Sequence, residues 1–191
     1  LSENGVINDI FHGGLEQKER ERTITRFKNG SCRILVSTDL AARGLDIPAI
    51  DAVIHYHLPV NEEAYTHRNG RTARMNASGT AYVIVGLEEV LPDYIPDDLH
   101  YESLPTELTI PVPPKWVTLY IGKGKKDKVN KVDIVGFLCQ QGNLDKSDIG
   151  QIDVKDFFCY VAVNREHGDR IAQSLNGKKL KNKSVKIELA Y

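Results

Sequence analysis

Short apolar runs separated by charged helical segments constrain the first hundred residues more than any other feature. The runs lie at residues 7–12, 32–37, 52–56 and 79–85. Between them, residues 15–28 and a stretch beginning at Asn61 have helical character. Strands that alternate with helices form a parallel sheet that helices cover. The sequence therefore predicts an α/β domain in this half of the chain.

Residue types mark two of the expected helix ends. Asn61 precedes Glu62 and Glu63, and an N-cap asparagine followed by acidic residues in the first turn suits the positive end of the helix dipole. Gly30 follows residues 15–28 and can end that helix in the left-handed conformation.

The last 80 or so residues follow a different order of elements. Strands are expected at 116–122, 149–154, 157–163 and 184–190, and helices at 133–141 and 165–175. The order β-α-β-β-α-β is that of the α+β ferredoxin-like fold. The segment IPVPPK before it has three prolines in six residues, which predicts a stiff linker. We expect domains at 1–108 and 116–191, joined by residues 109–115.

The net charge of −1 hides a difference between the two halves. Residues 1–112 hold 10 Lys and Arg against 17 Asp and Glu, whereas residues 113–191 hold 15 against 9. Two domains with different partners are the simplest explanation. No apolar run approaches the roughly 20 residues that span a bilayer, and no secretory pattern begins the chain, so we expect a cytoplasmic protein. Three widely spaced cysteines predict neither a zinc site nor a disulfide framework.

The segment HRNGRTAR, residues 67–74, is the strongest candidate for a ligand site. Its arginines, Arg68, Arg71 and Arg74, recur every third residue, so a helix or a helical turn would carry them on one side. One guanidinium group can bind two phosphate oxygens at once. The alternative is a solvated basic helix face. Gly70 argues against it, because glycine in a helix costs about 1 kcal/mol relative to alanine.

A second candidate lies upstream, in RILVSTDLAARGLDIP, residues 33–48. An apolar run there breaks into the hydroxyl-rich turn of Ser37, Thr38 and Asp39. Open α/β sheets bind ligands just past the carboxyl ends of their strands.

These motifs resemble those of DEAD-box RNA helicases. STDLAARGLDIP resembles the fifth motif of their second RecA-like domain and HRNGRTAR the sixth. His12-Gly13 and the pair Gln17 and Arg20 resemble two further elements. In the sixth motif Asn69 stands where the family has an apolar residue, and Ala73 where it has glycine. A buried Asn69 would need a hydrogen-bond partner.

The same resemblance implies that part of the machinery is missing from this sequence. The chain contains no G-x-x-x-x-G-K-[ST] loop and no D-E-A-D, and the RecA-like domain would need one more strand at its start. We therefore expect a fragment that binds RNA but does not hydrolyse ATP alone.

The resemblance also implies roles for individual residues. Arg71 and Arg74 would be catalytic arginine fingers for the γ-phosphate of an ATP held, with Mg²⁺, by the missing domain. The other nucleotide-site residues would be Gly44, Asp46, His67 and Arg68, of which Asp46 would contact the ribose, while His67 and Arg68 would bridge to the partner domain. The RNA backbone would contact Gly13, Arg20 and Thr38.

The second half carries signatures of an RNA-recognition motif (RRM). LYIGKG, residues 119–124, resembles its first-strand signature with Tyr120 at the aromatic position, and DFFCYVAV, residues 156–163, resembles its third with Phe158 and Tyr160. Exposed aromatic rings there would stack on bases; alternatively, they fill a core.

Ten lysines form two clusters in the same half, and they would make RNA binding salt-dependent, unless they are merely solvated. The first cluster comprises Lys123, Lys125, Lys126, Lys128 and Lys131, and the second Lys178, Lys179, Lys181, Lys183 and Lys186.

Residues 133–163 resemble the RNA-binding appendage of the DbpA family of bacterial DEAD-box helicases. This implies a monomer that binds a 23S ribosomal RNA hairpin and the adjacent duplex during ribosome assembly. Two alternatives stay open: a purely RNA-binding protein with a degenerate RecA-like domain, and a DNA helicase or recombination domain.

Overall fold

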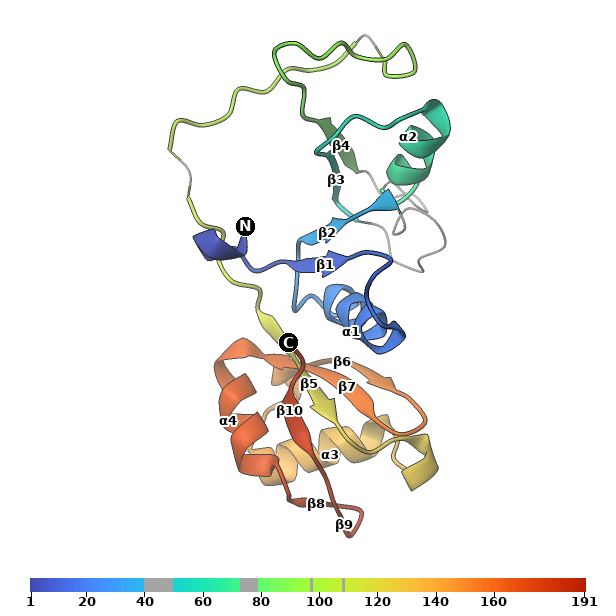
Figure 1. The fold of residues 1–191 in the computed structure, drawn as a ribbon. Coiled ribbons are helices and arrows are strands. Elements are labelled where there is room, and N and C mark those ends of the chain that lie inside the picture. The colour runs from blue at the N-terminus through green and yellow to red at the C-terminus, as the bar shows by residue number, and fades with distance from the viewer. Residues whose placement is uncertain (40–49, 73–78, 97, 108) are drawn as a thin grey trace. The chain divides into compact units, whose positions relative to one another are not determined.

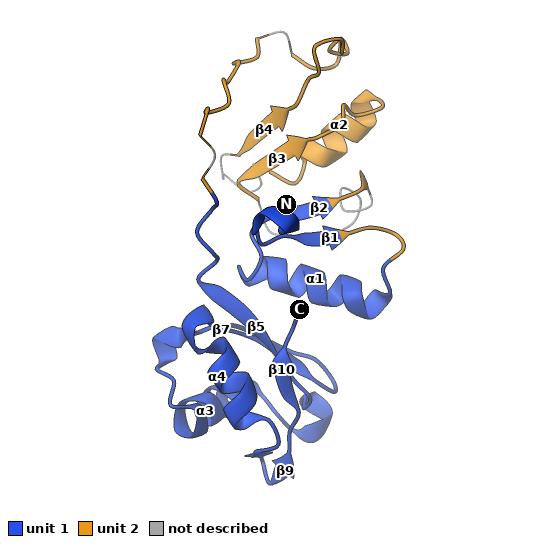
Figure 2. Ribbon diagram, turned by 60° about the vertical axis from the view of Figure 1, so that its left-hand side comes forward, with its two compact units in different colours: residues 1–10, 15–36, 110–191 blue, residues 11–14, 37–109 orange. Residues whose placement is uncertain are grey.

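The computed structural model describes residues 1–39, 50–72, 79–96, 98–107 and 109–191 (Figure 1). The chain forms two compact units (Figure 2). The first comprises residues 1–10, 15–36 and 110–191, and the second residues 11–14 and 37–109. The predicted linker at 109–115 stays a prediction.

The first half contains short strands and two α-helices. They are β1 (Asp9–Phe11), α1 (Gln17–Lys28), β2 (Leu35–Ser37), β3 (Ala52–His55), α2 (Glu62–Asn69) and β4 (Thr80–Val83). Strand β1 pairs with β2, and β3 pairs with β4 in parallel, with His55 opposite Val83. The predicted α/β class is confirmed. Within the described residues the strands form two separate pairs, and each strand is shorter than its apolar run.

Both marked helix ends have the expected geometry. The Asn61 side chain accepts a 2.8 Å hydrogen bond from the Ala64 amide, and Glu62 and Glu63 occupy the first turn of α2. Gly30, just beyond α1, has φ +73°, which is the left-handed conformation that favours glycine. The two predicted boundaries are confirmed.

The second half has the predicted ferredoxin-like order. Its elements are β5 (Trp116–Ile121), α3 (Lys131–Gly142), β6 (Ile149–Val154), β7 (Cys159–Asn164), α4 (Arg165–Leu175) and β10 (Ile187–Leu189). The strands form one antiparallel sheet in the order β10-β5-β7-β6. A small hairpin of β8 (Lys179–Leu180) and β9 (Lys183–Ser184) precedes β10.

Strand alternation explains the core of this domain. Leu119 and Val161 lie on the sheet face toward the helices, where they meet Ile134 of α3 and Ile171 of α4, all 0% exposed. Burying each such side chain stabilises the fold by about 1.5–3 kcal/mol. Figure 1 shows both helices against this sheet.

Two of the three cysteines are buried. Burial raises the pKa of Cys32 to about 11 and that of Cys159 to about 12, so both stay as neutral thiols at physiological pH. Within the described ranges, no helix is long and apolar enough to cross a membrane.

Candidate nucleotide and RNA sites

Helix α2 ends before the second arginine of the segment. Its last residue is Asn69, and the Gly70 amide caps it by donating to the Thr66 carbonyl at 2.8 Å. Arg68 is therefore in the last turn of the helix, whereas Arg71 lies beyond it. The Arg71 amide still donates to the Arg68 carbonyl at 3.3 Å, in a turn that follows the helix, and Arg74 lies outside the described residues, so a common side for the three arginines stays a prediction. We refer to residues 68–72 as the arginine turn.

Arg68 is held by residues at or just after the ends of β2 and β3. Its Nε donates to Asp39 Oδ1 at 2.5 Å and its Nη2 to Asp39 Oδ2 at 3.2 Å. Nη1 donates to the His57 carbonyl at 3.0 Å and lies 3.5 Å from His55 Nδ1. These bonds use four of the five N–H donors of a guanidinium. Arg68 thus joins the turn after β2 to α2, and its contact with a partner domain stays a prediction.

Asn69, which departs from the family motif, has a hydrogen-bond partner. Its Oδ1 lies 2.8 Å from Nε2 of His55, which is 1% exposed. Burial lowers the pKa of His55, although the hydrogen bond to Asn69 opposes that shift. His55 was not predicted as a site residue, because nothing in the local sequence marks it.

The backbone of the arginine turn is fixed to Ile50. The Ile50 amide donates to the Arg71 carbonyl at 3.1 Å, and Thr72 Oγ1 donates to the Ile50 carbonyl at 2.8 Å. Ile50 and Thr72 form a parallel bridge. A cation carried on an anchored turn suits a role that demands exact placement.

Two predicted RNA contacts lie at strand ends in the second unit. Gly13 follows β1 and Thr38 follows β2, and the Thr38 amide donates to the Phe11 carbonyl at 3.3 Å. The carboxyl ends of these strands therefore lie together, as expected of a ligand-binding edge. Arg20, in α1, donates from Nε to the Leu15 carbonyl at 2.9 Å.

The first lysine cluster lies in a loop tied to the turn between β6 and β7. The Lys125 amide donates to the Lys155 carbonyl at 2.9 Å, and the Lys126 amide to the Asp156 carbonyl at 2.8 Å. Lys125 and Lys126 are exposed. The loop backbone is thus fixed while its ammonium groups reach solvent.

The two lysine clusters meet in space through one shared carboxylate. Lys123 and Lys183 lie 3.4 and 3.3 Å from the same oxygen of Asp127. Lys181 lies 2.7 Å from Asp133, and this contact, with the Asn130 amide, lowers the pKa of Asp133. We call the ten lysines together the lysine surface.

The three aromatic side chains predicted to stack on RNA lie together. Ring centroids are 5.5 Å apart for Tyr120 and Phe158, 5.9 Å for Tyr120 and Tyr160, and 5.3 Å for Phe158 and Tyr160. Tyr160 is only 2% exposed, whereas Tyr120 and Phe158 are half-buried. Stacking stays a prediction, and the burial of Tyr160 argues against its part in it.

Residues of α1 and the turn after it cover part of this sheet face within the first unit. Asn29 Nδ2 donates to Thr118 Oγ1 at 2.8 Å, and Thr118 Oγ1 lies 2.8 Å from Ser31 Oγ. Glu21 lies 3.2 Å from Lys155 Nζ. Because Thr118 is 0% exposed, the sheet is not an open platform at this point.

Comparisons with known proteins match both halves. The helicase conserved C-terminal domain matches residues 1–76, and the DbpA RNA-binding domain matches residues 118–189. The ATP-dependent RNA helicase DbpA of Escherichia coli is 37% identical over 99% of this chain, and that of Bacillus subtilis 30% identical over all of it. The chain thus carries a helicase C-terminal domain and a DbpA RNA-binding domain, and over its whole length it is similar to DbpA helicases.

The chain spans less than half the length of these DbpA relatives, 43% of the first and 46% of the second. Among solved structures, a DEAD-box protein of Methanococcus jannaschii is 43% identical over 44% of this chain and 23% of its own, with a TM-score of 0.41.

Three residues that the DbpA resemblance assigns to the nucleotide site, Gly44, Asp46 and Arg74, lie outside the described residues. His67 is half-exposed, with Nδ1 3.7 Å from Glu63 Oε1 in the preceding helical turn. In the part of the chain that the structure describes, no group of three or more His, Cys, Asp or Glu side chains is arranged to hold a metal ion.

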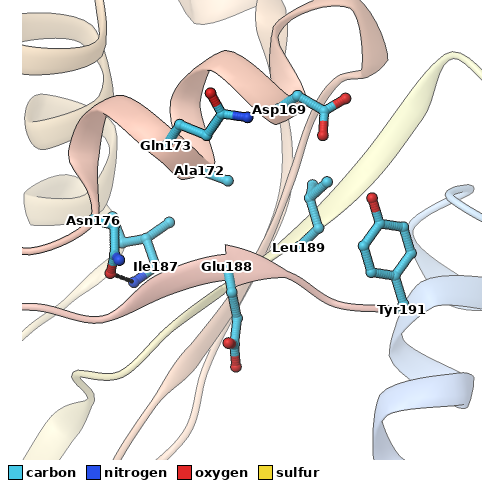
Figure 3. A pocket seen from close by; sticks show the side chains of 8 residues that line it. All are labelled: Asp169, Ala172, Gln173, Asn176, Ile187, Glu188, Leu189 and Tyr191. Atoms are coloured by element: carbon cyan, nitrogen blue, oxygen red, sulfur yellow. Dashed lines mark hydrogen bonds between the residues drawn. The ribbon is translucent and has the colours of Figure 1, made fainter.

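An open groove of about 460 Å³ lies between α4 and β10 (Figure 3). It is lined by Asp169, Gln173, Asn176, Leu189 and Tyr191, among others. The described site residues predicted from the DbpA resemblance all lie elsewhere. We therefore give this groove no part in nucleotide or RNA binding.

Proposed function

We propose that this chain works as the C-terminal part of an ATP-dependent RNA helicase that its RNA-binding domain directs to a 23S ribosomal RNA hairpin during ribosome assembly. Its named relatives are ATP-dependent RNA helicases. The proposed form is a cytoplasmic monomer that acts with an ATP-binding RecA-like domain.

The nucleotide part of the proposal rests on the arginine turn. An arginine finger stabilises the negative charge that develops on the γ-phosphate, and it can do so only if its position is fixed beforehand. The bridge between Ile50 and Thr72 supplies such anchoring next to Arg71. The donors present, guanidinium groups, fit a triphosphate. ATP with Mg²⁺ would supply the free energy for RNA release, and Arg71, with Arg74, would supply positive charge.

The RNA part rests on the lysine surface, the observation that carries the proposal furthest. Lys123 of the first cluster and Lys183 of the second share Asp127, so the two clusters meet at this carboxylate, and Lys125 and Lys126 beside it are exposed. Neutralising several RNA phosphates releases counterions, which makes affinity fall steeply with salt. Because Tyr160 is buried, we favour this surface over the aromatic face as the main contact with the hairpin.

The first experiment tests ATP hydrolysis. The chain is joined to the N-terminal RecA-like domain of a DbpA helicase, and RNA-stimulated ATP turnover is measured with and without Arg71→Ala. We expect turnover to fall about 10³-fold or more. His100→Phe, at an exposed position in the same unit, is the control. Turnover unchanged by Arg71→Ala would remove the finger assignment.

The second experiment tests RNA binding. Binding of a 23S hairpin is titrated at several salt concentrations for Lys126→Ala, Tyr120→Ala and the control Lys115→Ala, which lies outside both clusters. Lys126→Ala should weaken binding and reduce the salt slope by about 0.7–0.9. A loss seen only with Tyr120→Ala would favour the aromatic face, and equal affinity for unrelated hairpins would remove the targeting role.

A further inference from the structure

A buried histidine at the end of β3 is not explained by packing. In this strand Ile54 is 63% exposed whereas His55, its neighbour, is 1% exposed. Imidazole is a poorer core group than an aliphatic side chain, since its two nitrogens lose water and must find partners. Both nitrogens of His55 have them: Nε2 is 2.8 Å from Asn69 Oδ1, and Nδ1 is 3.5 Å from Arg68 Nη1.

These partners determine the state of the ring. Arginine can only donate a hydrogen bond, so Nδ1 of His55 must accept and carries no proton. Nε2 then carries the proton and donates to the Asn69 carbonyl oxygen. The ring is therefore the neutral Nε2–H tautomer. Burial, which lowers the pKa of His55, acts in the same direction.

The two residues that His55 holds also support the backbone of the arginine turn. The Arg71 amide donates to the Arg68 carbonyl at 3.3 Å, and the Thr72 amide donates to the Asn69 carbonyl at 2.9 Å. The His55 ring thus contacts the side chains of Arg68 and Asn69. The backbone carbonyls of these two residues accept hydrogen bonds from the amides of Arg71 and Thr72.

We propose that His55 is a positioning residue for ATP hydrolysis: its neutral ring holds Arg68 through Nδ1 and Asn69 through Nε2, and so sets the place of Arg71. This rests on the proposed function. It also accounts for Asn69, whose amide replaces the apolar residue of the family motif. The side chains facing His55 are Arg68, Asn69 and Tyr65 from α2 and Asp39 from the turn after β2.

The first test uses this chain alone and needs no turnover. The ¹⁵N spectrum of the imidazoles, with His55→Phe to assign the signal, should show a neutral Nε2–H ring near pH 7. In His55→Phe the amide signals of Arg71 and Thr72 should shift, while the control His100→Phe leaves them in place. A charged ring, an Nδ1–H tautomer or unmoved amide signals would overturn the proposal, whether or not the protein hydrolyses ATP.

The second test separates positioning from packing. His55→Phe leaves the Asn69 amide without its partner, whereas the double variant His55→Phe/Asn69→Leu makes both sides apolar and should recover the unfolding midpoint. In the protein joined to an ATP-binding domain, kcat should fall about tenfold in both variants with little change in KM, since in each Arg68 loses its contact with His55 Nδ1. Recovery of kcat together with the midpoint would show that His55 only fills space.

If Arg71→Ala leaves turnover unchanged, the finger assignment fails and kcat says nothing about His55. The tautomer and the amide shifts would then still decide whether His55 holds the arginine turn.

Discussion

Replacing Gly124 by alanine should displace the loop that carries the first lysine cluster. A Cβ at this position would lie 2.3 Å from the Lys155 carbonyl oxygen and 2.6 Å from that of Asp156, where ordinary contact begins at 3.4 Å. Gly124 has φ −145°, which any residue adopts, so the effect is steric alone. Both oxygens belong to the backbone and cannot rotate away.

The cost follows from the same contacts. The two crowded oxygens accept the Lys125 and Lys126 amides, so relief of the clash breaks or lengthens those hydrogen bonds. Overpacking of about 1–3 kcal/mol and about 1 kcal/mol for lost hydrogen bonding give a destabilisation of about 2–4 kcal/mol. RNA affinity should fall as well, because the lysines move.

Urea unfolding of the whole chain measures this, with Gly136→Ala as a matched control. Gly136 lies in α3, and a Cβ there would meet nothing within 4 Å. Alanine should therefore stabilise that helix by about 0.5–1 kcal/mol. The two substitutions must change the free energy of unfolding in opposite directions. If Gly124→Ala is neutral or stabilising, the close approach of the loop to residues 155–156 is not real.

Two further outcomes are expected. Thr118→Val should lower stability by about 1–3 kcal/mol in urea unfolding, because it leaves the buried Asn29 amide without its acceptor; an unchanged midpoint would mean that the contact does not form. Burial lowers the pKa of His55 in the folded protein. As pH falls below about 6.5, His55 therefore binds a proton in the unfolded chain before it does so in the folded chain. The free energy of unfolding should decline from that pH and level off below the folded-state pKa of His55. His55→Phe should show a smaller decline than His100→Phe; equal declines would remove His55 as the cause.

Features that depend on neighbouring residues were predictable from the sequence. Asn61 caps α2 and Gly30 ends α1 because caps are decided within one turn of chain. Strand ends were less predictable: the sequence predicted a strand over residues 79–85, yet β4 covers only Thr80–Val83. Strand length depends on the partner's length, and spacing within one run contains no information about it.

Features that depend on distant partners were predicted in kind but not in detail. The sequence indicated that a buried Asn69 needs a hydrogen-bond partner, but not that His55, on another element, supplies it. The spacing of the arginines indicated a helix or a helical turn, but not that α2 ends at Asn69 or that Thr72 forms a bridge with Ile50 beyond it. Both features depend on contacts between residues that lie on different elements, which the local sequence does not specify.

The structure uses its two kinds of cation differently, and their chemistry explains why. Arg68 engages a carboxylate bidentately and a carbonyl at once, which a planar, weakly hydrated guanidinium does well. Such a group is ordered before any ligand arrives, so it suits a catalytic cleft, where position determines rate. Lys125 and Lys126 are fixed through their backbone while their side chains are exposed, so their hydrated ammonium groups can follow phosphates of different spacing. Replacing Arg68 by lysine should therefore disrupt the hydrogen bonds to Asp39 and the His57 carbonyl, and with them the nucleotide site, although the positive charge is kept. Lys126→Arg, in contrast, should leave RNA affinity within about threefold of the original value.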